Sequence, residues 1–190
     1  MKITCIVGSA RVNGSTNYLI DTFISGVREN NAETEIKKYS VAASKLNFCY
    51  GCKECYKDGN CVQNDDVLEI VKDIVSSDYV VIAAPSYWAD VPGQLKTFFD
   101  RNTPFGDTNP NRTLVADKAI KGIAVAVRAG VREAENELIL NSIEHYFGHL
   151  GIETVKKVSV CRTDTLNDLL EKQQDDIQSV YDLGKNINNL

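Results

Sequence analysis

Residues 2–17 have the sequence KITCIVGSARVNGSTN, in which an apolar run ends in a polar turn with two glycines. Ile3–Val7 carries apolar or small side chains on both faces of an extended chain, as in a strand that helices cover on both sides. From Ser15 onward, apolar residues recur with helical spacing, which predicts a helix over Ser15–Glu29. A strand, a tight turn and a helix in this order indicate the first unit of a parallel α/β sheet.

The same alternation continues along the whole chain. Strands are expected at Lys2–Val7, Glu33–Tyr39, Tyr79–Ala84, Lys121–Val127 and Glu153–Val160. Helices are expected at Ser15–Glu29, Asp66–Ser76, Gly93–Arg101, Arg132–Leu150 and Leu166–Ile187. Strands that alternate with helices predict a doubly wound, five-stranded parallel sheet in three α/β/α layers, with the flavodoxin-like order 2-1-3-4-5. We expect one domain over residues 1–190, with long connections at Ser40–Asp65 and Asn102–Ile120 that are long enough to carry function.

Composition excludes several classes of protein. The chain has 190 residues, 43% apolar content and a net charge of −5, which gives no electrostatic basis for binding nucleic acid or an anionic membrane. No segment approaches the roughly 20 apolar residues of a membrane span. The start of the sequence lacks the long apolar region of a signal peptide. We therefore expect a soluble cytoplasmic protein.

The turn after the first strand is a candidate anion site. A helix that begins at Ser15 would present unpaired backbone N–H groups and a partial positive charge to this turn. Ser9, Ser15 and Thr16 add hydroxyl donors, and Arg11 can pair with two phosphate oxygens. The turn has neither the G-x-G-x-x-G pattern of dinucleotide-binding folds nor the lysine of a P-loop. The alternative is an ordinary capped helix after a polar turn.

A second loop follows the third strand, where residues 85–101 have the sequence PSYWADVPGQLKTFFDR. In an open α/β sheet, ligands bind outside the carboxyl ends of the strands, beside strands 1 and 3. The segment Pro85–Trp88 would place backbone amides and aromatic rings against a flat heterocycle at that edge. The alternative is a turn whose aromatic side chains only pack.

Three motifs together resemble the NADPH-dependent FMN reductase family of flavodoxin-like proteins: GSxRxxGST after the first strand, PSYW after the third, and the following GQLKxxxDR. The resemblance covers most of the chain and implies a flavin-dependent oxidoreductase in which the bound FMN, and no catalytic side chain, performs the chemistry. It also implies NAD(P)H as a possible reductant, and a homodimer or homotetramer. The cofactor-binding residues that it implies are Ser9, Arg11, Asn13, Ser15, Thr16, Asn17, Pro85, Ser86, Tyr87, Trp88, Arg128 and Gly130.

Four of the six cysteines lie within thirteen residues, at Cys49, Cys52, Cys55 and Cys61. Short spacings of this kind allow four thiolates to hold an iron–sulfur cluster, although the last gap is longer than in the ferredoxin motif. Zinc usually draws its ligands from two well-separated pairs, and disulfides are disfavoured in a reducing cytoplasm. Four free thiols are a further alternative. The spacing resembles that of the iron–sulfur flavoproteins, a branch of the same family, and so implies a [4Fe-4S] cluster.

The remaining two cysteines and the two histidines have simpler interpretations. Cys5 and Cys161 lie in or beside strand-like runs, where a buried thiol acts as a small hydrophobe. His145 and His149 have a spacing that can hold a metal, but their aromatic neighbours favour an ordinary helix face. Asp65 and Asp66 are expected to cap the following helix.

The leading hypothesis is an electron-transfer iron–sulfur flavoprotein that passes electrons between a small carrier and an acceptor through FMN and the cluster. The first alternative is an NAD(P)H-dependent FMN or quinone reductase without a cluster. The second, from a different class, is a flavodoxin-like binding or regulatory module with little turnover.

Overall fold

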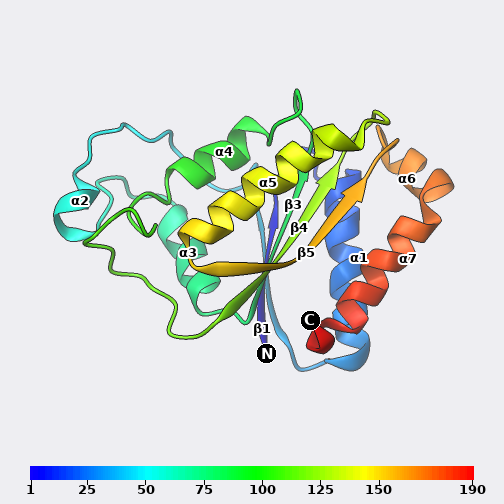
Figure 1. Ribbon diagram of the computed structural model, residues 1–190, viewed down its shortest axis with the longest axis horizontal. Coiled ribbons are helices and arrows are strands. Elements are labelled where there is room, and N and C mark those ends of the chain that lie inside the picture. The colour runs from blue at the N-terminus through cyan, green and yellow to red at the C-terminus, as the bar shows by residue number, and fades with distance from the viewer.

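The computed structural model describes residues 1–190 and is built around one parallel sheet of five strands (Figure 1). The strands are β1 (Lys2–Val7), β2 (Glu35–Ser40), β3 (Tyr79–Pro85), β4 (Ile120–Val127) and β5 (Ile152–Val160). Their order across the sheet is β2-β1-β3-β4-β5, and every neighbouring pair is parallel. The predicted fold class and strand order are thus confirmed.

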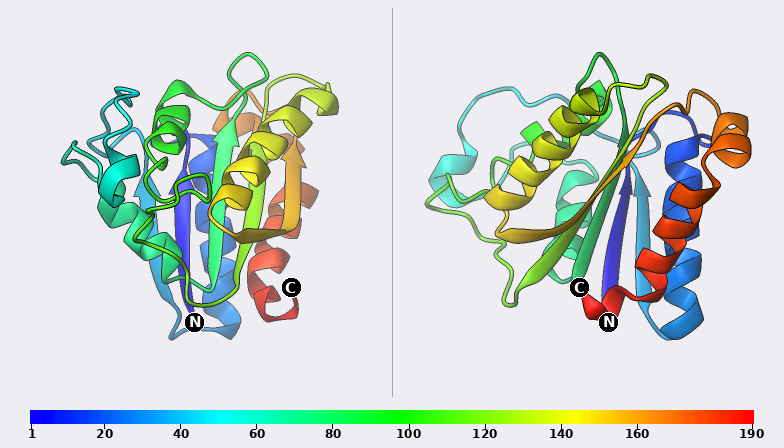
Figure 2. Two further views of the ribbon diagram at one scale, coloured as in Figure 1. Left: turned by 60° about the vertical axis from the view of Figure 1, so that its left-hand side comes forward. Right: turned by 45° about the vertical axis from the view of Figure 1, so that its right-hand side comes forward.

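Helices cover both faces of the sheet (Figures 1 and 2). One face carries α1 (Ser15–Asn30), α6 (Leu166–Lys172) and α7 (Gln174–Lys185). The other face carries α3 (Val67–Val75), α4 (Gly93–Asp100) and α5 (Glu133–His149). A short helix, α2 (Cys55–Asp58), lies in the cysteine-containing connection, which projects beyond the sheet (Figure 1), and a 3₁₀ turn at Ile187–Asn189 ends the chain.

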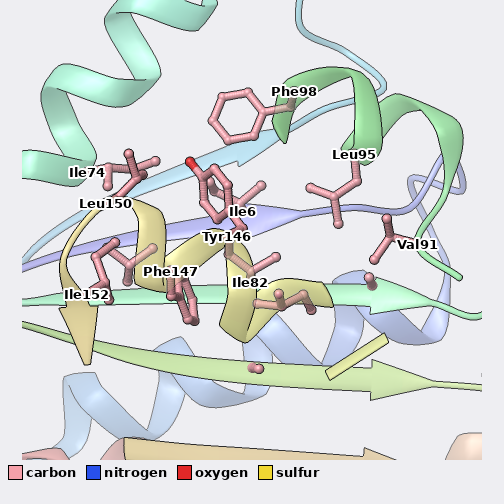
Figure 3. Close-up of a cluster of buried hydrophobic side chains, with 14 of the residues drawn as sticks. Ile6, Ile74, Ile82, Val91, Leu95, Phe98, Tyr146, Phe147, Leu150 and Ile152 are labelled. Carbon is pink, nitrogen blue, oxygen red and sulfur yellow. The ribbon is translucent and has the colours of Figure 1, made fainter. Parts of the chain in front are cut away.

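Two apolar cores result from the alternation of side chains along each strand. From β1, Ile3 and Val7 contribute to the core beneath α1, whereas Ile6 contributes to the core beneath α4 and α5. In this second core Phe98 of α4 and Phe147 of α5 are fully buried (Figure 3). Full burial of one such side chain contributes about 1.5–3 kcal/mol. Apolar cores therefore hold helices against both faces of the sheet. The turns at the carboxyl ends of the strands start from this rigid framework.

The end of the chain differs from the sequence prediction of one helix over Leu166–Ile187. The helix breaks at Gln173, whose backbone (φ −125°, ψ 42°) leaves the helical region. The break directs α7 along α1, where a Cβ added to Gly184 would lie 2.1 Å from the carbonyl oxygen of Phe23. Close packing of two backbones thus overrides local helix propensity, and no proline or glycine marks the break in the sequence.

Smaller differences concern single elements. The four-residue helix α2 was not predicted, and Cys161 is partly exposed rather than buried. None of the helices combines the length and the apolar composition that crossing a membrane would require.

Candidate functional site

The turn after β1 forms a cradle of backbone amides at the start of α1. The first helical N–H groups, those of Ser15, Thr16 and Asn17, donate to no acceptor in the protein, and the preceding Gly14 provides no side-chain cap. The side chains of Ser15 and Thr16 are buried at this point. Unpaired amides at a helix N-terminus, together with the helix dipole, favour an anion.

The loop after β5 closes one side of this cradle. Arg11 Nη1 donates to the carbonyl oxygen of Asp164 at 2.9 Å, and Ser15 Oγ donates to that of Thr165 at 3.1 Å. The resulting cavity of about 100 Å³ lies among the ends of β1, β3, β4 and β5. Arg11 is exposed at its rim, with guanidinium donors left for a bound anion.

The turn after β3 carries the aromatic residues. Tyr87 and Asp90 exchange backbone hydrogen bonds of 2.9 and 3.1 Å, which closes a tight hairpin over Trp88 and Ala89. Both central residues have positive φ, 54° and 60°, the geometry of a type I′ turn, which is usually built from Asn and Gly. Left-handed backbone at a non-glycine residue costs on the order of 1–3 kcal/mol. The strained turn holds the Trp88 ring fully exposed.

A second, open cavity of about 430 Å³ lies beneath this turn. It shares Ser86, Tyr87, Arg128 and Ala129 with the first cavity, so the two cavities adjoin, and together they are called the depression. The elongated site therefore offers an anion cradle at one end and an aromatic surface at the other.

Arg128 lies where the two cavities meet. Its Nη1 pairs with Glu135 at 2.6 Å and donates to the carbonyl oxygen of Arg132, while its buried Nε has no partner. A Cβ on Gly130 would lie 2.5 Å from Arg128 Nη2, so the glycine is needed for the guanidinium to fold back over the loop. The site thus contains one buried cationic donor that is not fully satisfied within the protein.

Most of the cofactor-binding residues expected from the sequence lie at this depression. Those lining the smaller cavity are Ser9, Arg11, Ser15, Thr16, Pro85, Ser86, Tyr87 and Arg128, and those confined to the larger one are Trp88 and Gly130. Neither cavity is lined by Asn13 or Asn17. Asn13 is exposed, and the Asn17 side chain donates to Asp21 at 3.0 Å.

Sequence reasoning missed the loop after β5. Thr163 and Asp164 line the smaller cavity, although no motif marks them. The available signal was topological, because the carboxyl end of every strand in a parallel sheet meets the same edge. Glu135, which looks like surface charge in the sequence, is the partner of Arg128.

The four clustered cysteines line a third cavity, of about 220 Å³, between the connection and the end of α4. Left-handed backbone at Gly51, Lys53 and Gly59 (φ 58° to 78°) curls the connection around this space. All four thiols are free, and they form no group of three or more that could hold a metal ion as they stand. The four thiols thus line one cavity without forming a preformed metal site.

A buried arginine supports this cavity. Arg101 is 2% exposed, and its guanidinium forms an ion pair with Asp65, donates to the carbonyl oxygen of Asn47 at 2.9 Å, and approaches Cys61 Sγ at 3.4 Å. Burial alone would raise the pKa of Asp65, but its hydrogen bonds from Arg101 and the Asn47 amide outweigh burial, so the pKa is lowered. Asp65 and Arg101 thus form a charged pair that ties the connection to α4.

This pair corrects the expectation that Asp65 and Asp66 cap α3. Asp65 Oδ1 is 3.4 Å from the Val67 amide, at the limit of a hydrogen bond, while its main contacts are to Arg101 and Asn47. Asp66 accepts from the Lys45 amide at 2.6 Å instead of capping the helix. Both carboxylates serve the fold of the connection.

Electrostatics among the thiols disfavour four isolated thiolates. Burial, and then the neighbouring Cys61, Cys52 and Cys49, raise the pKa of the Cys55 thiol. Four negative charges in one cavity need compensation by cations, and the guanidinium of Arg101 beside Cys61 is already paired with Asp65. The arrangement suits a cationic centre that several thiolates share.

Helix α4 connects the two sites. It begins at Gly93, shortly after the aromatic turn, and ends at Asp100, which lines the cysteine cavity. Eight helical residues span about 12 Å. The depression and the cysteine cavity thus lie at opposite ends of one short helix.

Comparison with known proteins identifies the family. The family model described as NADPH-dependent FMN reductase matches residues 1–161. An iron-sulfur flavoprotein of Methanocaldococcus jannaschii is 35% identical over 147 residues, which cover 77% of this chain and 72% of that protein. An iron-sulfur flavoprotein of Archaeoglobus fulgidus is 35% identical over 135 residues, 71% of this chain but only 58% of that longer relative.

Solved structures confirm the fold. An NAD(P)H:quinone oxidoreductase from Methanothermobacter marburgensis superimposes with a TM-score of 0.76 at 17% identity, covering 99% of this chain and 97% of that one. An FMN-dependent NADH-azoreductase from Bacillus anthracis in complex with FMN gives a TM-score of 0.75 at 14% identity, covering 98% and 99%.

Proposed function

The chain belongs to the NADPH-dependent FMN reductase family of flavin-dependent oxidoreductases, and we propose that it is an electron-transfer iron–sulfur flavoprotein. FMN would bind in the depression at the carboxyl edge of the sheet, and a [4Fe-4S] cluster would bind in the cysteine cavity. Electrons would pass between a small carrier and an acceptor through these two centres.

The residues of the depression fit FMN. The unpaired amides of Ser15 and Thr16 would bind the phosphate, and Arg11 would add a charge-assisted hydrogen bond from the rim. The turn with Tyr87 and Trp88 would lie against the isoalloxazine ring. Arg128, which lines both cavities, would donate to the ring system from its guanidinium group. When bound, FMN supplies one- and two-electron redox chemistry, while these residues bind and orient it.

The single observation that carries the FMN assignment is the cradle of unpaired amides that opens into an aromatic cavity. An anion site alone fits many phosphorylated ligands. The cavity that Ser15 lines shares four residues with the one beneath Trp88, which favours a ligand in which a phosphate is joined to a flat ring.

The cysteine cavity supplies the ligands that a [4Fe-4S] cluster needs. Such a cluster takes four thiolates, and the four thiols of Cys49, Cys52, Cys55 and Cys61 line one cavity. The names of the related iron-sulfur flavoproteins support the same assignment. When present, such a cluster exchanges single electrons.

Cofactor analysis of anaerobically purified protein tests the proposal. The proposal predicts about one FMN, four iron and four acid-labile sulfide per chain. Absence of bound flavin, with no uptake of added FMN, would contradict the whole proposal and leave a binding module as the remaining interpretation. Flavin without stoichiometric iron would contradict the cluster.

A second function, an NAD(P)H-dependent quinone or FMN reductase, is favoured by the match to the family model described as NADPH-dependent FMN reductase. Anaerobic mixing with NADPH separates the two. Rapid bleaching of the flavin at a rate that Cys52→Ser leaves unchanged would favour this alternative. Slow bleaching by NADPH, with fast reduction by a reduced one-electron carrier, would favour electron transfer through the cluster.

A further inference from the structure

Both histidines of the chain lie one turn apart at the end of α5. Tyr146, Phe147 and Leu150 of the same turns point into the core (Figure 3), which leaves His145 and His149 on the outer side of the helix. Their Nε2 atoms lie 3.1 Å apart, with the two rings nearly perpendicular at 81°. The outer nitrogens of the two imidazoles thus lie within hydrogen-bond distance of each other.

Asp107 determines which ring nitrogen of His149 carries a proton. Its carboxylate lies 2.7 Å from His149 Nδ1, within hydrogen-bond distance. An ionised carboxylate can only accept, so His149 Nδ1 carries a proton. In a neutral ring, Nε2 of His149 then presents its lone pair toward His145.

We propose that His145 and His149 form a bidentate binding site for a divalent transition-metal ion of the Zn²⁺, Ni²⁺ or Cu²⁺ type, the ions that imidazole ligands suit. Imidazole nitrogens lie about 2.0–2.1 Å from Zn²⁺, so two such ligands are about 2.9 Å apart at a right angle and about 3.4 Å apart at the tetrahedral angle. The observed 3.1 Å falls between these limits.

Binding requires one rearrangement of protons. Without metal, His145 Nε2–H can donate to the lone pair on His149 Nε2. With metal, the His145 proton moves to Nδ1, both Nε2 lone pairs coordinate the ion, and no net proton is released from the neutral pair. Asp107 remains bonded to His149 Nδ1, the arrangement in which a carboxylate orients a metal-bound histidine.

The surroundings have room and charge for a dication. The histidines border a cavity of about 390 Å³ between α4 and α5, with the carboxylates of Asp90 and Asp100 on its wall and Lys96 paired with Asp100. No third side chain is close enough to complete a protein-only site. Water would fill the remaining coordination positions.

An ion at this site would stabilise the Asn102–Ile120 connection, which contributes to the wall of the cysteine cavity. Asp107 also donates its backbone N–H to the carbonyl oxygen of His149 at 2.9 Å, so it already ties the Asn102–Ile120 connection to α5. Thr103 of the same connection lines both this cavity and the cysteine cavity. A ligand bound only by the folded chain raises its stability by mass action.

Imidazole NMR tests the site directly, because both histidines of the chain belong to it. In ¹⁵N-labelled holoprotein without added metal, we expect the Nδ1–H tautomer at His149 and the Nε2–H tautomer at His145. On titration with Zn²⁺, both rings should become Nδ1–H tautomers with metal-shifted Nε2 resonances, in a single joint transition. Zinc bound by thiols does not produce this signature. Resonances that do not respond, or a response of one ring alone, would overturn the proposal.

Matched variants sharpen the test. His145→Gln should abolish the metal shift at His149, and His149→Gln that at His145, since a single imidazole binds weakly. Asp107→Asn should weaken Zn²⁺ binding by about 10- to 100-fold, the usual effect of losing an orienting carboxylate. Ser142→Ala, which alters another residue of the same cavity wall, should leave the affinity unchanged. Equal affinity in Asp107→Asn and wild type would contradict the positioning role of Asp107.

Discussion

The phosphate turn (residues 8–17) and the cysteine connection (residues 40–65) form binding sites by opposite means. The first uses backbone amides that the start of α1 fixes in place. The second uses side chains on a long connection, held in shape by the buried pair of Arg101 and Asp65. A site made from secondary structure is as stable as the fold, whereas a site made from a connection depends on the few contacts that tie it down.

The largest expected effect follows from removing the buried ion pair between Arg101 and Asp65 in the cysteine connection. In Arg101→Met, Asp65 becomes a buried unpaired charge, a change that costs about 3–5 kcal/mol. We expect a lower free energy of unfolding in urea and loss of cluster iron. Lys96→Met removes a lysine from an exposed ion pair with Asp100 and should cost no more than about 1 kcal/mol. A similar small effect for Arg101→Met would show that the connection does not depend on this pair.

The next effect concerns the phosphate turn. Arg11→Ala should weaken FMN binding by roughly 1–3 kcal/mol, about 5- to 150-fold in Kd, because the variant loses a charge-assisted donor and keeps the amide cradle. Fluorescence quenching of FMN measures this Kd, and iron content should not change. Arg162→Ala, at an exposed arginine that lines neither FMN cavity, is the control. An unchanged Kd for FMN in Arg11→Ala would show that Arg11 does not contribute to FMN binding.

The smallest expected effect tests whether the backbone of the aromatic turn after β3 is strained. Ala89→Gly relieves a left-handed backbone (φ 60°), which costs about 1–2 kcal/mol at a non-glycine residue. Glycine also gives the unfolded chain about 0.4–1 kcal/mol of extra conformational entropy, so the free energy of unfolding should rise by only about 1 kcal/mol or less. Ala134→Gly, in the first turn of α5, should instead destabilise the protein, since glycine is a poor helix former. Destabilisation by Ala89→Gly would show that the turn is not strained in this way.

The same contrast explains what the sequence could predict. Strand periodicity and the motif around Ser15 were sufficient for the sheet order and for the cradle, because both depend on local pattern and on the common edge of a parallel sheet. The break at Gln173 was not predictable locally, since it results from the packing of α7 on α1. The pairing of Asp65 with Arg101 was missed for a similar reason: the two residues are 36 positions apart, and a capping pattern next to a helix gave a simpler local interpretation.

The phosphate turn and the cysteine connection should bind their cofactors independently of each other. Cofactor analysis of anaerobically purified Cys52→Ser tests this independence most directly. Cys161→Ser, which changes a thiol outside the cysteine cavity, is the control and should retain both cofactors. We predict that Cys52→Ser loses its iron and acid-labile sulfide but binds FMN with the wild-type stoichiometry. Loss of FMN together with the iron in Cys52→Ser, at unchanged folding, would show that the two sites are not independent.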